Sequence, residues 1–176
     1  MSRAIKPDEP ILHSDLHACI KLTVNQVDVS DIKERALAEG YREQTSRHIT
    51  ILSSSQIKEI KKHCFSDTKE LHDQLLELLL KFDWKYEEKD LFHIEKSGYW
   101  DGSDILENRK SYIRTIEMPD MKNFYKELDK VFKINLPVKV PHITLFTKGE
   151  RKNPKYYGIA VSSKEEFKKL KPVKIN

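Results

Sequence analysis

The sequence predicts an α+β protein with a duplicated two-lobed fold, in which each lobe is an antiparallel sheet backed by helices and a cleft lies between the lobes. Two observations support this prediction. Strand and helix patterns follow one another in mixed order along the chain, and a His-x-Thr tripeptide recurs after 94 residues, at His48 and at His142. No linker composition interrupts the 176 residues, so we expect residues 1–176 to form a single domain with pseudo-repeats at about 16–53 and 110–147.

Composition narrows the class of protein. Charged residues make up 34% of the chain, and Glu77 interrupts the longest apolar run, so neither a membrane span nor the core of a secretory signal is expected. We therefore expect a cytoplasmic protein without a membrane partner and without an obligate protein partner. The net charge of +4 is compatible with an anionic ligand but does not establish one.

The first half of the chain contains a strand, a helix and a second strand. Apolar and polar residues alternate over residues 16–24, which predicts a half-buried strand. Residues 27–39 carry helix-capping residues and stop at Gly40, as is typical of a helix. Alternation returns over residues 47–53 and predicts the second strand.

The middle and second half continue with the same types of element. Residues 55–82 predict two helical stretches with a break near residues 64–67, and their leucines need a surface to pack against. The remaining expectations are strand 90–96, polar loop 97–110, strand 112–118, helix 119–133, strand 140–147, strand 156–162 and helix 163–170.

The internal repeat becomes visible when the chain is aligned with itself at a shift of 94 residues. Strand 16–24 then falls on residues 110–118, and residues 47–52 fall on residues 141–146 without a gap. Identity outside the tripeptide is slight, so the repeat depends on the order and length of the elements.

Chance alone does not account for the two His-x-Thr tripeptides. Seven histidines and seven threonines in a chain of this length predict roughly 0.3 His-x-Thr pairs, and fewer when the middle residue must be hydrophobic. The alternative is that both histidines are ordinary hydrogen-bonded strand residues. Two occurrences at equivalent positions of a repeat favour a shared function.

Strand geometry gives the motif a chemical meaning. Residues i and i+2 of a strand share a face, so His48 projects with Thr50, and His142 projects with Thr144. Two such pairs facing each other could act on one phosphate, with one imidazole taking a proton and the other giving one. The threonine hydroxyls could donate hydrogen bonds to the phosphate oxygens. Either histidine could be the base.

These residues resemble a known family, the two-histidine (2H) phosphoesterase superfamily, whose members carry two His-hydrophobic-Thr/Ser motifs in a duplicated two-lobed α+β fold. The motifs Arg47-His48-Ile49-Thr50 and Pro141-His142-Ile143-Thr144 match each defining position, and the resemblance covers nearly the whole chain. It implies metal-independent cleavage of nucleotide or RNA phosphodiesters, such as 2′,3′-cyclic phosphates, 2′-5′ linkages or cyclic oligonucleotides. The superfamily also includes enzymes described as 2′-5′ RNA ligases. No cofactor is implied.

Four further residues are candidates for binding the substrate. Tyr99 and Trp100 could stack on a base, although packing under their own loop is an equal alternative. Lys21 could reach the phosphate, and strand parity favours it over Arg114, although surface charges are more often solvated. Tyr157 is a weaker candidate for base stacking.

Two alternatives to a metal-independent enzyme are kept. One is a module that binds nucleotides or phosphorylated RNA ends without catalysis, and the other is a metal-dependent enzyme. Cys19 and Cys64 are expected to be reduced thiols, and the neighbours His63 and Cys64 are too few ligands for zinc. We therefore predict no metal site, and we assign surface or structural roles to the remaining histidines, which are His13, His17, His63, His72 and His93.

Overall fold

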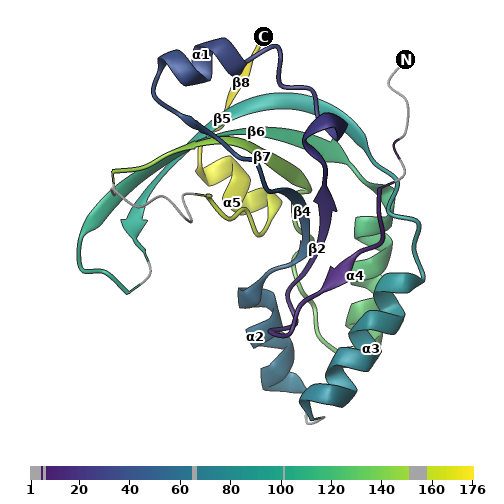
Figure 1. The fold of residues 1–176 in the computed structure, drawn as a ribbon. Coiled ribbons are helices and arrows are strands. Elements are labelled where there is room, and N and C mark those ends of the chain that lie inside the picture. Colours follow the sequence, from purple (N-terminus) through teal and green to yellow (C-terminus); the bar gives the residue numbers. More distant parts are fainter. Residues whose placement is uncertain (1–4, 6, 65–66, 101, 151–157) are drawn as a thin grey trace.

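A computed structural model describes residues 5, 7–64, 67–100, 102–150 and 158–176 of the chain. In these residues eight strands form one antiparallel sheet, accompanied by five α-helices, and this confirms the α+β class (Figure 1). The strand order is β1-β2-β4-β7-β6-β5-β8, and the short β3 pairs with β7. The strands are β1 (Ile11–Leu12), β2 (Ala18–Leu22), β3 (Arg42–Glu43), β4 (Arg47–Leu52), β5 (Glu87–Tyr99), β6 (Leu106–Glu117), β7 (His142–Lys148) and β8 (Val173–Ile175).

The helices begin and end at residues suited to these positions. Ser53 and Asp67 accept hydrogen bonds from backbone N–H groups in the first turns of α2 (Ser54–His63) and α3 (Thr68–Leu80), and Pro119 opens α4 (Pro119–Phe132). The predicted helix 27–39 starts too early, because Asp28 accepts the backbone N–H of Ser30 and so holds a local turn ahead of α1 (Lys33–Ala38). The helices are α1 (Lys33–Ala38), α2 (Ser54–His63), α3 (Thr68–Leu80), α4 (Pro119–Phe132) and α5 (Lys164–Lys169).

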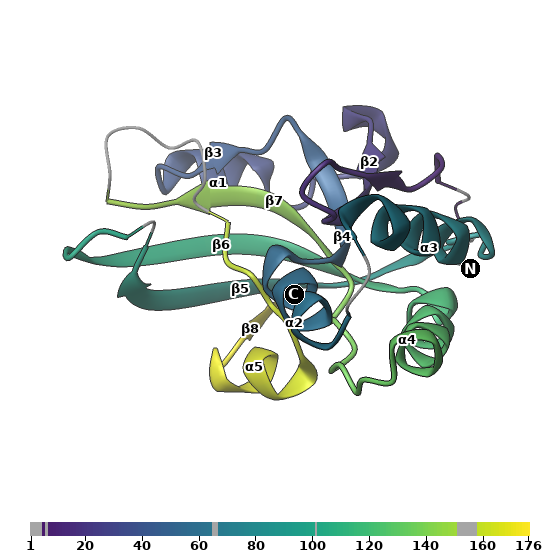
Figure 2. The same ribbon diagram turned by 90° about the horizontal axis from the view of Figure 1, so that it is seen from below.

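Strands β5 and β6 form a long hairpin, and the predicted polar loop 97–110 is wrong. Their pairing continues out to Tyr99 opposite Leu106, so only the short connection between these two residues turns. The polar side chains in this stretch are exposed to solvent or form hydrogen bonds with the opposite strand. Ser97, for example, donates a hydrogen bond to Asn108 on the opposite strand at 3.4 Å. The tip of the hairpin lies at the end of the molecule away from β2 and β4 (Figures 1 and 2).

The pairing of β2 with β4 is repeated, residue for residue, in the pairing of β6 with β7. Cys19 lies across from Thr50, and 94 residues later Ile113 lies across from Thr144. Both strand pairs also contain a register shift at equivalent positions, between Ala18 and Cys19 and between residues 112 and 113. The sequence alignment at a shift of 94 residues therefore describes equivalent positions in the sheet.

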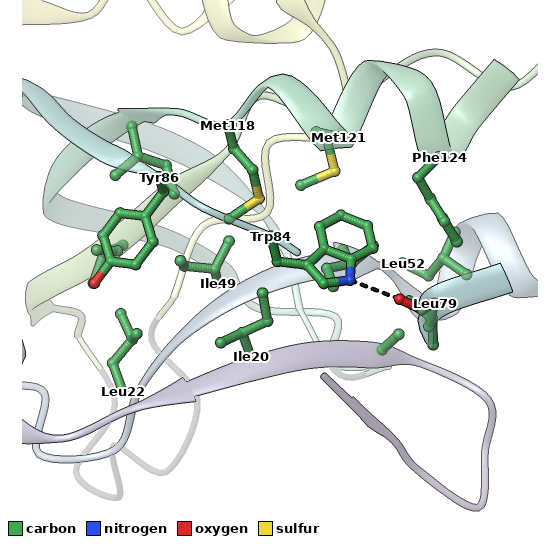
Figure 3. Packing of buried hydrophobic residues seen from close by; sticks show 14 of the residues in the cluster. Ile20, Leu22, Ile49, Leu52, Leu79, Trp84, Tyr86, Met118, Met121 and Phe124 are labelled. Atoms are coloured by element: carbon green, nitrogen blue, oxygen red, sulfur yellow. Dashed lines mark hydrogen bonds between the residues drawn. The ribbon is translucent and has the colours of Figure 1, made fainter. Parts of the chain in front are cut away.

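The main core lies on the face of β2 and β4 that carries Ile20 and Ile49. Figure 3 shows these side chains pointing toward the buried Trp84, with Met121 and Phe124 of α4 on its other side. The Trp84 indole N–H donates to the carbonyl of Leu79 at 2.8 Å, which satisfies its one polar atom. The opposite face of β4 therefore points away from this core.

Helices α1 and α4 each contact strands of the other half. Tyr112 of β6 donates a hydrogen bond to Glu39 at the end of α1, at 2.7 Å. Conversely, Tyr125 of α4 donates to the carbonyl of Ile51 in β4 at 2.8 Å. In both views α1 lies beside the long strands, and α3 and α4 lie near β2 and β4 (Figures 1 and 2). Within the described ranges, no helix has the length and apolar composition required to cross a membrane.

Candidate active site

The two His-x-Thr motifs are neighbours in the sheet. Ile49 of β4 lies directly across from Ile143 of β7, and both side chains are fully buried. The residues before and after each isoleucine therefore point to the opposite face. Antiparallel geometry, extended by one residue on each side of this pair, sets His48 toward Thr144 and Thr50 toward His142. In that arrangement the two histidines are diagonal neighbours, and the typical separation between such positions is about 7–8 Å.

The two imidazole rings are held in the same way. Nδ1 of His142 donates to the carbonyl of Val140 at 2.8 Å, and Nδ1 of His48 faces the carbonyl of Ser46 at 3.3 Å. In each case the acceptor is the residue two positions earlier. A carbonyl can only accept, so the hydrogen atom lies on Nδ1 and the neutral ring keeps a lone pair on Nε2. Each ring can thus offer Nε2 as a proton acceptor.

Desolvation lowers the pKa of both histidines. Burial removes water from around His142, and this desolvation is the main cause that lowers its pKa to about 4. The positive charges of Lys139 and His48 act in the same direction. Partial desolvation is also the main cause that lowers the pKa of His48, with contributions from His17 and Lys139. Hydrogen bonds to the backbone carbonyls oppose both shifts. Without a bound anion, both rings are therefore neutral at neutral pH.

Lys139 is a residue of this site that strand pattern and repeat did not indicate. Only 4% of its surface is exposed, and in the part of the chain described its ammonium group makes no hydrogen bond or ion pair. Burial lowers the pKa of Lys139 to about 8, and the charge of Glu166 opposes this shift. At neutral pH the ammonium group is therefore still mainly charged, and this charge acts on both histidines. A buried cation in this state favours an anionic ligand.

The irregular segment that contains Lys139 is fixed to the rest of the protein. Gln56 of α2 donates to the carbonyl of Pro137 at 3.2 Å, and its side-chain oxygen accepts from Tyr125 at 2.9 Å. At the other end of the segment, Ile116 donates its backbone N–H to the carbonyl of Pro141 at 3.1 Å. These bonds hold Lys139 and His142 in position from α2, α4 and β6.

Arg47 anchors the start of β4 and is not available to a substrate. Its guanidinium group is fully buried and donates to the backbone carbonyls of Gln44, Val24 and Val27 and to the carboxylate of Glu43, at 2.7–3.2 Å. These bonds attach the residues before β4 to the loop after β2. Arg47 thereby fixes the strand that carries the first motif.

The predicted substrate-binding residues have different positions. Lys21 lies across from His48, is exposed, and shares the face of the motif side chains, whereas Arg114 lies across from Ile143 and is paired with Asp31 at 2.7 Å. This arrangement agrees with the parity argument that preferred Lys21.

Tyr99 and Trp100 lie at the tip of the β5–β6 hairpin, and Tyr99 is 68% exposed. The indole of Trp100 donates to the carbonyl of Glu107, and the guanidinium of Arg109 lies 4.1 Å from its ring centre. Glu107 is eight residues along β6 from Thr115, the partner of His142, which corresponds to about 27 Å along the strand. Trp100 thus anchors its own hairpin. Tyr157 lies outside the described residues.

Comparisons with protein-family profiles, with curated proteins and with solved structures found no match to this chain. The interpretation of the site therefore depends on its geometry and on the resemblance of its motifs.

Proposed function

We propose that this protein is a 2H-type phosphoesterase with a duplicated two-lobed fold, acting without metal on nucleotide or RNA phosphodiesters in the cytoplasm. The observation that carries the proposal is the pairing of Ile49 with Ile143, which presents both His-x-Thr motifs on one face of the sheet. The repeated register and the repeated register shift support the duplication.

The four motif side chains and Lys139 suit the chemistry of a phosphodiester. A phosphate held between the histidines receives hydrogen bonds from Thr50 and Thr144, and the charge of Lys139 balances its negative charge. The bound anion raises the pKa of both histidines, because an opposite charge favours the imidazolium form. One ring can then hold a proton while the other stays neutral, as acid and base catalysis requires.

We infer that His142 is the base and His48 is the acid. His142 is half-buried and its pKa is lowered to about 4, so it stays neutral and takes the proton of the attacking hydroxyl or water. His48 is the more exposed of the two rings, so the bound anion can more readily raise its pKa and give the imidazolium that protonates the leaving oxygen. The attacking and leaving oxygens occupy opposite sides of phosphorus, and the diagonal placement of the histidines provides a group at each side.

The test is a panel of phosphodiesters incubated with the purified protein in the presence of a strong chelator. The panel contains 2′,3′-cyclic mononucleotides, 2′-5′ and 3′-5′ linked dinucleotides, and cyclic oligonucleotides. We expect cleavage of at least one class and a loss of about 100-fold or more in His48→Ala and in His142→Ala. The matched control is His63→Ala, because His63 is an exposed residue of α2.

The outcomes separate the three interpretations. Cleavage that survives the chelator and requires both histidines supports the proposal and names the substrate class. Cleavage that the chelator abolishes while the protein stays folded indicates a metal-dependent enzyme. Nucleotide binding that requires Lys139 and the histidines, without turnover of any substrate in the panel, indicates a binding module.

A further inference from the structure

Three side chains with metal-binding atoms converge at the turn between β1 and β2. They are His13, His17 and Cys19, and one ligand atom from each lies within 4.8 Å of the others. None of them belongs to a His-x-Thr motif.

The backbone of this turn brings the two histidines together. Leu12 pairs with Ala18, the N–H of His13 donates to the carbonyl of His17 at 3.0 Å, and the imidazole rings stack with their centres 4.0 Å apart. Leu16 adopts a left-handed conformation, with φ of 71°, although its side chain is fully buried. A non-glycine residue rarely takes this conformation, and here it closes the turn over its own buried side chain.

The donor set and its spacing fit a borderline-soft divalent cation. Nε2 of His13 lies 3.4 Å from Sγ of Cys19. Zinc bonds of about 2.3 Å to sulfur and about 2.0–2.1 Å to nitrogen separate two tetrahedral ligands by about 3.6 Å. Imidazole nitrogen and thiolate sulfur are also the ligands that zinc prefers over carboxylate or water.

Asp15 gives the cluster an outer partner. Its carboxylate bonds to Nδ1 of His17, which directs Nε2 of that ring away from the aspartate. A metal-bound histidine commonly donates its second N–H to a carboxylate, and this fixes the tautomer that binds the metal. The turn thus contains three ligands and one residue that orients a ligand.

We propose that His13, His17 and Cys19 bind one zinc-class ion per chain, with solvent as the fourth ligand. The ion ties the β1–β2 turn to β2 and stabilises the fold. Cys19 lies across from Thr50, so the ion sits beside the proposed phosphoesterase site. The proposal does not rest on that function, because the ligands are separate from the motif residues.

Cobalt(II) provides a spectroscopic test. Protein stripped of metal with a chelator is titrated with Co²⁺, and the expected result is a thiolate-to-cobalt charge-transfer band that saturates at one equivalent and disappears when Zn²⁺ is added. Cys19→Ser should lose this band, and His17→Gln should weaken Co²⁺ binding at least tenfold. The matched controls are Cys64→Ser and His63→Gln, which change the other cysteine and its neighbouring histidine. Both controls should behave as the unmodified protein.

Thermal unfolding gives a second readout. Zn²⁺ should raise the Tm of the unmodified protein and of Cys64→Ser, and should leave the Tm of Cys19→Ser unchanged. Absence of the charge-transfer band, or a band that depends on Cys64, would overturn the proposal and leave a plain hydrogen bond between Cys19 and His13. Because phosphodiester cleavage is measured separately in chelator, this failure is distinguishable from a failure of the proposed function.

Discussion

Ile49 of β4 lies directly across from Ile143 of β7, and this pairing joins the two halves of the sheet. Both isoleucines are fully buried, so the direction of each motif is fixed by the core behind it. A shift of one residue in either strand would turn a histidine and a threonine into the core and an isoleucine toward solvent. The hydrophobic residue in the middle of each motif thus sets the geometry of the polar residues around it.

The two motif threonines should contribute to the rate more than to binding. Thr50→Val and Thr144→Val keep the size of the side chain but remove its hydroxyl, so each should lower kcat by roughly 10- to 100-fold with a smaller change in KM. Steady-state kinetics on the substrate found in the panel measures both constants. Thr68→Val, at the exposed start of α3, is the control. A KM effect alone would assign the threonines to ground-state binding.

Lys139 should act on anion binding and not on stability. Lys139→Met removes a buried charge that lacks an ion pair in the described residues, so we expect at least a tenfold loss of affinity for inorganic phosphate and no fall in Tm. Calorimetric titration and thermal unfolding measure the two effects. Lys21→Met, which removes an exposed charge from the same face, should lose less affinity. A large fall in Tm with unchanged affinity would make Lys139 a structural residue.

The pKa of His142 predicts a loss of stability in acid. The pKa is about 4 in the folded protein and about 6.5 in an unfolded chain, so the unfolded state binds a proton first as the pH falls through this window. The free energy of unfolding should therefore fall between pH 6.5 and 4. His142→Gln should reduce the loss of unfolding free energy between pH 7.5 and pH 5 by up to about 2 kcal/mol. The reduction is smaller to the extent that solvent reaches the half-buried ring.

Urea unfolding at the two pH values measures this difference, with His63→Gln as the control. An equal loss of stability in His142→Gln and in the unmodified protein would mean that His142 is not the group that titrates in this window.

Arg47 should be a large contributor to stability. Arg47→Met leaves the carbonyls of Val24, Val27 and Gln44 without this donor, so we expect a loss of about 3 kcal/mol in the free energy of unfolding. Glu43 loses its buried partner and keeps the ion pair with Lys33. Arg35→Met removes an exposed ion pair with Glu39 and should have a much smaller effect. Urea unfolding at neutral pH compares the two. Similar values for both variants would contradict the anchoring role of Arg47.

The strands of both motifs were predictable because their alternating residues have one buried and one polar face. The helix before the first motif was predicted too long, since the capping residues around Asp28 form a turn that stops short of α1. The hairpin of β5 and β6 was taken for a loop, because polar side chains at its exposed positions resemble those of a loop. These residues form strands because their backbone groups pair with neighbouring strands, and local sequence patterns do not indicate such pairing.

The sequence by itself determined the residues of the candidate site, because the repeat at 94 residues and the strand period of two select His48, Thr50, His142 and Thr144. Tertiary structure decided how these residues meet, since the contact between Ile49 and Ile143 is a long-range pairing. It also decided the position of Lys139, which lies in an irregular segment where no periodicity predicts the direction of a side chain. Burial and charge at such a position depend on the elements packed around it, and these come from both halves of the chain.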